Sequence, residues 1–181
     1  MKQTVKWLAA ALIALGLNQA VWADDVSDFR ENLQAAAQGN AAAQHNLGVM
    51  YENGEGVRQD DAEAVRWYRQ AAAQGLAQAQ TNLGLMYYKG RGVRQDDAEA
   101  VRWFRQAAAQ GDAAAQHNLG VMYENGQGVR QDDAEAVRWY RKAAEQGYAA
   151  AQTNLGLMYA NGRGVRQDDA EAVRWYRQAA A

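Results

Sequence analysis

The chain has 181 residues, no cysteine and no proline, and its 19 basic and 21 acidic residues leave a formal net charge of −2 at pH 7. Without cysteine it has no disulfide, and without a basic excess it lacks the charge of a nucleic-acid-binding protein. Frequent alanine and absent proline favour an all-helical fold.

Residues 1–23 have the pattern of a signal peptide. Lys2 and Lys6 begin it, an apolar run extends from Trp7 to Leu17, and Val21-Trp22-Ala23 suits cleavage before Asp24. The run is shorter than the roughly 20 residues that span a bilayer, and the alternative is an uncleaved anchor. Without the two lysines the 19 basic residues become 17 against 21 acidic ones, a net charge of −4. We expect an exported protein, periplasmic, at the cell surface or secreted, without stable membrane insertion after cleavage.

The rest of the chain repeats every 36 residues. The stretch GVRQDDAEAVRW occurs four times unchanged, with its tryptophan at positions 67, 103, 139 and 175. Internal repetition of this kind indicates stacked structural units. Residues 24–39 resemble the second half of a unit and are expected to form an N-terminal capping helix. The expected units are residues 40–75, 76–111, 112–147 and 148–181.

Each unit is predicted to form two helices. In the first unit, Leu47, Met50 and Tyr51 recur at helical spacing, and Asn53-Gly54 ends that helix. Asp60 caps the second helix, and Glu63 completes a capping-box pattern. The buried stripe of this helix is expected to be Ala64, Val65, Tyr68, Ala71 and Ala72. One pair of helices cannot bury so much apolar surface alone, so we expect an all-α, right-handed α-solenoid of helix-turn-helix repeats, with about four units and a leading half-unit.

The motifs LGxMY and AxxWYxxA resemble the tetratricopeptide repeat, and specifically its Sel-one-like variant (SLR) of the exported bacterial type. Leu47-Gly48 and Tyr51 match the signature of the first helix, and Ala64 and Tyr68 match that of the second. The 36-residue unit exceeds the standard repeat of about 34 residues, and the extra length falls in the inter-helix loop, as in the variant. A cysteine-rich branch of the family is stapled by disulfides, which this chain lacks.

Residues suited to catalysis or metal binding are few. After residue 23 there is one serine, Ser27, and there are two histidines, His45 and His117, with no Ser-x-x-Lys or Gly-x-Ser-x-Gly motif. The histidines lie two units apart, too far to share a zinc ion. The acidic loops lack calcium-loop spacing, and no glycine motif fits a phosphate loop. We predict no enzyme, no metal and no cofactor. The alternative, which the cysteine-rich branch suggests, is an envelope hydrolase acting on β-lactams or the cell wall.

The four units differ along one stripe of the first helix. The changes fall at positions 42, 45, 49, 52 and 53 of the first unit and at their equivalents, which share one helical face. The resemblance implies that first helices line a concave groove, so this stripe would hold ligand. The alternative is drift of exposed positions, and duplication of a two-unit block explains why alternate units agree. Invariant asparagines beside the stripe either hold a bound peptide or bond a neighbouring loop.

Tyr88 and Lys89 are the most distinctive pair of the stripe, because tyrosine is a common binding anchor and lysine can meet a carboxylate. With Glu52 and Glu124 they imply a partner segment of mixed charge. The predicted ligand-binding residues are His45, Asn46, Val49, Glu52, Asn53, Gln78, Thr81, Asn82, Leu85, Tyr88, Lys89, His117, Asn118, Val121, Glu124, Asn125, Thr153, Asn154, Leu157 and Asn161.

These patterns together predict a protein-interaction scaffold or adaptor. Its partner would be a protein or peptide, not nucleic acid, met in envelope assembly or in contact with host cells. A purely structural spacer is the other alternative. The tryptophans are expected to pack between repeats. Val173, Trp175 and Tyr176 in the last helix are expected to be partly exposed and to form a docking or dimer contact.

Overall fold

The computed structural model describes residues 24–180, so the predicted signal peptide lies outside the described residues. Residues 24–37 are helical, and no strand occurs within 24–180. The helices that follow are α2 (Ala41–Asn53), α3 (Asp61–Ala73), α4 (Ala77–Lys89), α5 (Asp97–Ala109), α6 (Ala113–Asn125), α7 (Asp133–Glu145), α8 (Ala149–Asn161) and α9 (Asp169–Ala179). Even-numbered helices are the first helices of the units and odd-numbered helices the second. The predicted all-α repeat fold is confirmed.

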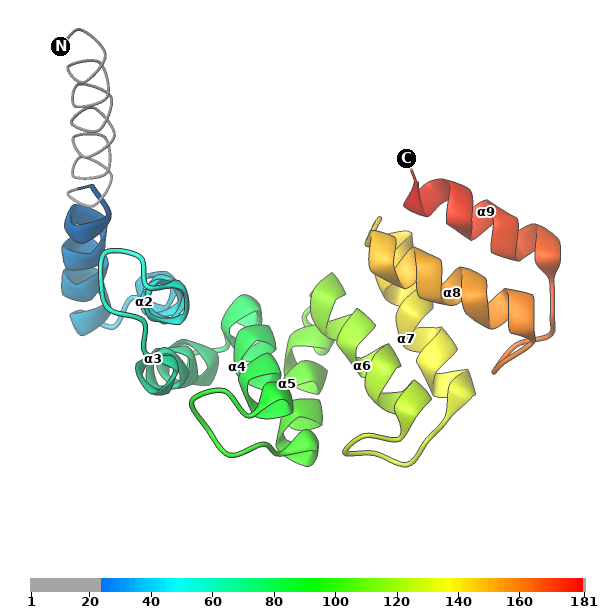
Figure 1. The fold of residues 1–181 in the computed structure, drawn as a ribbon, viewed down its shortest axis with the longest axis horizontal. Coiled ribbons are helices and arrows are strands. Elements are labelled where there is room, and N and C mark those ends of the chain that lie inside the picture. The colour runs from blue at the N-terminus through cyan, green and yellow to red at the C-terminus, as the bar shows by residue number, and fades with distance from the viewer. Residues whose placement is uncertain (1–23, 181) are drawn as a thin grey trace, which may run out of the picture.

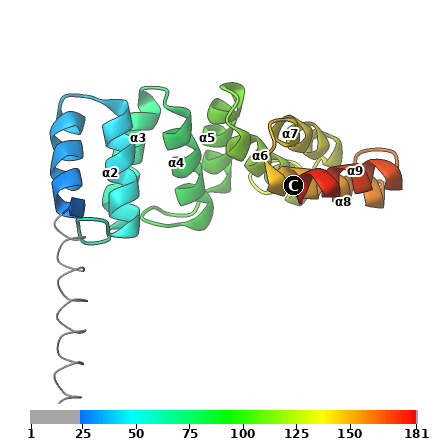
Figure 2. The ribbon, with the colours of Figure 1, turned by 90° about the horizontal axis from the view of Figure 1, so that it is seen from above.

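The helix pairs follow one another along a curved path from the leading helix, residues 24–37, to α9 (Figure 1). Seen from above, the pairs near the N-terminus stand upright, whereas α8 and α9 lie across the view, so the pairs rotate along the path (Figure 2). Extensive contacts join only helices that are consecutive in the chain, as in a solenoid. Within the described part of the chain, no helix has the length and apolar character needed to cross a membrane.

An aspartate caps each second helix, as the sequence predicts. Asp60 is extended, and its side chain accepts hydrogen bonds from the backbone N–H groups of Ala62 and Glu63. The predicted capping box is nevertheless incomplete. The N–H of Asp60 donates to the carbonyl of Tyr51, and the carboxylate of Glu63 pairs with Arg66 instead.

The hydrophobic core lies between units. Val65 and Tyr68 of α3 pack with Leu83 and Met86 of α4, and Trp103 from the following second helix covers them. Equivalent clusters join α5 with α6 and α7 with α8. The leading helix packs on α2 in the same way, and the first tryptophan of the repeat completes that cluster. The tryptophans therefore pack between repeats, as predicted.

Two glycines in each unit permit close approach. A Cβ atom on Gly48 would lie 2.4 Å from ring carbons of Tyr68, so the ring of the second helix rests directly on the first. Gly92 has a φ of +64°, and a Cβ atom there would lie 2.1 Å from the carbonyl oxygen of Asp61. The loop of one unit thus rests on the second helix of the preceding unit. This contact explains why the repeated stretch begins with glycine.

Candidate functional site

The predicted ligand-binding residues all lie on the four first helices, α2, α4, α6 and α8, but they differ in exposure. Thr81 is buried. The exposed members are Asn46, Asn53, Gln78, Lys89, Asn125, Thr153, Leu157 and Asn161. The half-buried members are His45, Val49, Glu52, Asn82, Leu85, Tyr88, His117, Asn118, Val121, Glu124 and Asn154.

Glu52, predicted to face a ligand, is bound by the next unit. One of its oxygens accepts from Nη1 of Arg91 at 2.8 Å, and the other accepts from the hydroxyl of Tyr68 at 2.7 Å. Arg91 also donates to both oxygens of Asp61, at 3.0 and 2.7 Å. We call this group the carboxylate cluster. A second carboxylate cluster joins the third and fourth units and consists of Glu124, Tyr140, Arg163 and Asp133.

The electrostatics of the first cluster favour a fixed protonation state. Burial and the hydrogen bond to Glu52 raise the pKa of Tyr68 well above its usual value. The hydrogen bond to Asp61 raises the pKa of Arg91. Tyr68 therefore stays neutral and Arg91 stays charged over the physiological range, which suits a structural contact and not proton transfer.

We call the contact between two successive units a joint. The joint between the second and third units lacks most of the residues of a carboxylate cluster. Tyr88 stands where the other joints have glutamate, and its hydroxyl lies 3.5 Å from Oε1 of Gln127, which stands where they have arginine. Phe104 replaces the tyrosine of the carboxylate cluster and is buried. At the other two joints the ring hydroxyl donates to a glutamate, and Tyr88 stands in place of that glutamate here, so a hydroxyl on the ring would lack this acceptor. The alternation between units thus follows in part from which residues meet across each joint, an explanation separate from drift and from ligand selection.

Most of the invariant asparagines form side-chain hydrogen bonds to residues of neighbouring helices. Nδ2 of Asn82 lies 3.2 Å from Nε2 of His45, and Asn154 approaches His117 at the same distance. Asn46 donates to Asn32 of the leading helix at 3.1 Å. Burial lowers the pKa of both histidines, so each neutral ring can accept the amide hydrogen. The partners lie on helices, so these contacts correspond neither to a bound peptide nor to the neighbouring loop considered for the asparagines.

Part of the stripe stays open to solvent. Lys89 is exposed, and the ion pairs among residues 24–180 do not include it. The ring of Tyr88 is half-buried against the core formed by α5 and α6. A cavity of about 400 Å³ opens between the leading helix and α2, and its lining includes Asn40 and Asn46. These are the positions where a bound segment could reach the first helices.

The described residues offer little for catalysis. Ser27 is exposed on the leading helix, and no histidine or lysine within 24–180 bonds to it. In the same residues, no group of three or more histidine, cysteine, aspartate or glutamate side chains could hold a metal ion. Each histidine contacts an asparagine and a tyrosine ring, as His45 contacts Asn82 and Tyr68.

Cavities that the sequence does not predict lie at the loop side of the first, third and fourth units, and we call them the loop-edge pockets. Each lies between the tyrosine of a first helix and the Val-Arg-Gln-Asp segment of the following loop. Tyr51 and Val57 line one of about 450 Å³ in the first unit. Pockets of about 500 and 700 Å³ occur in the third and fourth units, beside Tyr123 and Tyr159. Their signal in the sequence is the constancy of exposed loop residues, a pattern that a scaffold role also explains.

Comparison with known proteins agrees with this architecture. A sequence model described as the Sel1 repeat matches residues 41–76, 77–112, 113–148 and 149–181. The crystal structure of a protective antigen from uropathogenic Escherichia coli strains, described as displaying an SLR fold, is 50% identical, with a TM-score of 0.80. The match covers 82% of this chain and 32% of that one.

Two further structures extend the comparison. A Sel1 repeat protein from Oxalobacter formigenes is 40% identical with a TM-score of 0.81, and the match covers 84% of this chain and 61% of that one. Cysteine rich protein B of Helicobacter pylori is 22% identical with a TM-score of 0.54 over 67% of this chain and 87% of that one, which supports the fold alone. This chain thus spans less than two thirds of the first two proteins. No curated protein matches it.

Proposed function

The chain belongs to the Sel1 repeat family, and from that premise we propose that it is a non-catalytic adaptor that binds a peptide or protein segment in a concave groove lined by its first helices. Solenoids of this family are commonly protein-interaction scaffolds. Stacked helix pairs provide extended concave surfaces for such binding. The ligand would contact the predicted residues that remain open on α2, α4, α6 and α8.

The observation that carries this proposal is the combination of Tyr88 and Lys89 at the middle joint. Tyr88 offers part of a ring held in place by the neighbouring core, and Lys89 offers a charge that no carboxylate of residues 24–180 neutralises. Aromatic side chains held in this way are common anchors of interfaces. Glu52 and Glu124 are bound to arginines, so the partner's charge would be set mainly by Lys89. The sequence predicts a partner segment of mixed charge. We instead expect a segment that presents a carboxylate beside an apolar group.

We propose that this adaptor acts outside the cytoplasm, in envelope assembly or in contact with host cells. Two features support this setting: the signal pattern of residues 1–23 and the similarity to a protective antigen of a pathogen. We also propose a secondary docking contact on the last unit, since Leu157 and Val173 are 47% and 46% exposed. Trp175 was expected to be partly exposed in this contact, and this expectation is wrong, because Trp175 is buried in the core between α7 and α8.

Affinity capture from envelope extract, with bound proteins identified by mass spectrometry, tests the proposal. One bait is the protein itself, and the second carries Tyr88→Ala and Lys89→Ala. A third, matched bait carries Arg102→Ala and Gln106→Ala, which alter two exposed residues of α5 in the same unit. We expect a partner that is retained by the first and third baits and lost by the second. A partner held equally by all three baits would remove the groove from consideration.

A further inference from the structure

The loop-edge pockets present a second surface, made by residues that the proposed groove does not use. In the third unit the pocket has a volume of about 500 Å³, and its lining includes Arg105, Tyr123, Val129 and Arg130. Tyr123 precedes Glu124 on α6, and a step of one residue turns a side chain to another face of the helix. A ligand in this pocket would therefore contact a different side of the first helix from one on the stripe.

Two arginines from different units meet at this pocket. Arg105 comes from α5 of the second unit, and its Nη2 donates to the hydroxyl of Tyr123 at 2.8 Å. Its guanidinium carbon lies 5.9 Å from the centre of the same ring. Arg130 comes from the loop of the third unit and is exposed. The second arginine of this pocket is therefore supplied by the preceding unit.

The charges of this pocket are not balanced within the described residues. The ion pairs among residues 24–180 include neither Arg105 nor Arg130, whereas the nearby Arg138 pairs with Glu135. The one carboxylate in the lining, Asp132, is occupied as a helix cap and accepts from two backbone N–H groups. The pocket thus has two guanidinium groups and one carboxylate that already accepts backbone hydrogen bonds, beside a tyrosine ring and a valine side chain.

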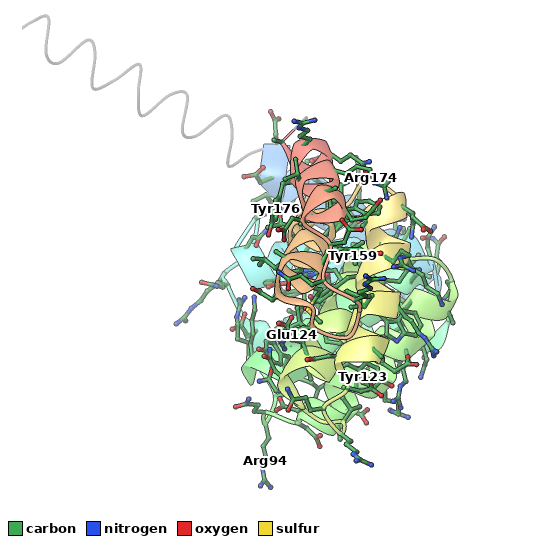
Figure 3. The ribbon with its side chains drawn as sticks, turned by 90° about the vertical axis from the view of Figure 1, so that its right-hand side faces the viewer. Arg94, Tyr123, Glu124, Tyr159, Arg174 and Tyr176 are labelled. Atoms are coloured by element: carbon green, nitrogen blue, oxygen red, sulfur yellow. The ribbon has the colours of Figure 1, made fainter. Side chains whose placement is uncertain are left out.

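The arrangement recurs along the solenoid. Arg69 donates to Tyr87 at 2.8 Å and Arg141 to Tyr159 at 2.6 Å, so the second and fourth units place an arginine of the preceding unit on the same tyrosine. In Figure 3, Arg94, the loop arginine of the second unit, projects from the ribbon into solvent. In the first unit, Leu33 stands 36 positions before Arg69, and the pocket has Arg58 alone. The lining of the fourth-unit pocket has Arg166 with Asp168 and Glu171, and Glu171 pairs with Arg174.

We propose that the loop edge of the second, third and fourth units binds an acidic polypeptide segment, with one glutamate or aspartate side chain of the partner beside each arginine–tyrosine pair. Guanidinium groups bind carboxylates through paired, charge-assisted hydrogen bonds. The stem of an acidic side chain packs on the tyrosine ring and the valine, which a free anion cannot use. The arginine–tyrosine pair occurs at Tyr87, Tyr123 and Tyr159, and repeated contacts along one partner segment add avidity, because the second and third contacts are intramolecular.

Fluorescence anisotropy with the purified full chain tests this inference. The probe is a labelled peptide of alternating glutamate and alanine, about 20 residues long so that it can reach several units. A peptide of the same length with glutamine in place of glutamate is the control ligand. The key variant is Arg105→Gln/Arg130→Gln. The matched control variant is Arg66→Gln/Arg138→Gln, which removes the same charge from two exposed arginines already paired with glutamates.

We expect the glutamate peptide to bind and the glutamine peptide not to bind. The key variant should weaken binding about fivefold to tenfold, since roughly 1 kcal/mol is lost with exposed charge contacts, and the control variant should change it less than twofold. Arg58→Gln in the single-arginine pocket of the first unit should have a smaller effect than Arg130→Gln. Circular dichroism establishes that each variant is folded.

Three results would overturn the inference. The first is equal binding of the two peptides. The second is equal weakening by the key and control variants, which would indicate a response to net charge alone. The third is displacement of the glutamate peptide by inorganic phosphate of about 10 mM at matched ionic strength, which would assign the pockets to phosphate groups.

Discussion

Nη1 of Arg91 and Oε1 of Glu52 are joined at 2.8 Å across 39 positions of sequence, and the same guanidinium holds Asp61 through its other nitrogens. Arg91 belongs to the second unit, while both carboxylates belong to the first. One side chain therefore connects the end of α2 and the start of α3 to the loop of the next unit. Its fractional exposure of 33% places the contact between a surface ion pair and a buried one.

Replacing Arg91 with glutamine should lower the free energy of unfolding by about 1 kcal/mol, because charge-assisted bonds to two carboxylates are lost while solvent screens what remains. Glutamine is the residue that position 127 carries at the middle joint. Urea denaturation measures the effect. Arg66→Gln, in a pair with 63% exposure of the arginine, is the control and should change stability by less than about 0.5 kcal/mol. Equal effects of the two substitutions would show that the cluster adds nothing to the joint.

The middle joint should accept a hydroxyl only together with a carboxylate. Phe104→Tyr alone introduces a buried hydroxyl without the glutamate that accepts its hydrogen bond at the other two joints, and it should cost about 1 kcal/mol. Adding Tyr88→Glu and Gln127→Arg rebuilds the residues of the carboxylate cluster, and we expect the triple variant to regain that loss. A thermodynamic cycle built from chemical denaturation gives the coupling energy. Strictly additive effects would contradict the interpretation that the alternation reflects contacts across joints.

Gly84→Ala should destabilise the second unit by about 1–3 kcal/mol, because its Cβ atom would lie 2.6 Å from the buried ring of Phe104. Combining it with Phe104→Leu should recover part of the loss, since the smaller side chain makes room. Thermal unfolding followed by circular dichroism reports both variants. Gln78→Ala, at an exposed position of the same helix, serves as the control. If the double variant recovered no stability, contact with the ring of Phe104 would not be the cause of the loss in Gly84→Ala.

Mild acid should weaken the first and third joints through the histidines. Burial lowers the folded-state pKa of His45 and His117 below the unfolded value of 6.5, so the unfolded state binds protons first. The associated stability is present above pH 6.5 and is lost as pH falls from there through the folded pKa. Urea midpoints measured between about pH 7.5 and 5 should fall, and His45→Gln/His117→Gln should flatten the decline. An unchanged profile in the double variant would assign the decline to other groups.

Local patterns in the sequence were sufficient to predict the helices, because apolar spacing, capping aspartates and terminating glycines act within a few residues. The contacts of the stripe required the structure. The bond from Glu52 to Arg91 depends on how far one unit turns relative to the next, and no pattern inside a unit contains that rotation. For the same reason the pairing of Arg105 with Tyr123 required the structure, since the two residues come from successive units. Constancy of an exposed residue among the units does not by itself separate a binding role from a role in the scaffold.

The two kinds of joint limit how a protein of this design can change length. If the second unit were lost, Glu52 would meet Gln127 instead of Arg91, and Asp61 would lose its guanidinium partner. If the second and third units were lost together, Glu52 would meet Arg163, and every remaining joint would keep a matching pair. Viable lengthening or shortening should therefore proceed by pairs of units, and inherited variants of this architecture should differ by two repeats more often than by one.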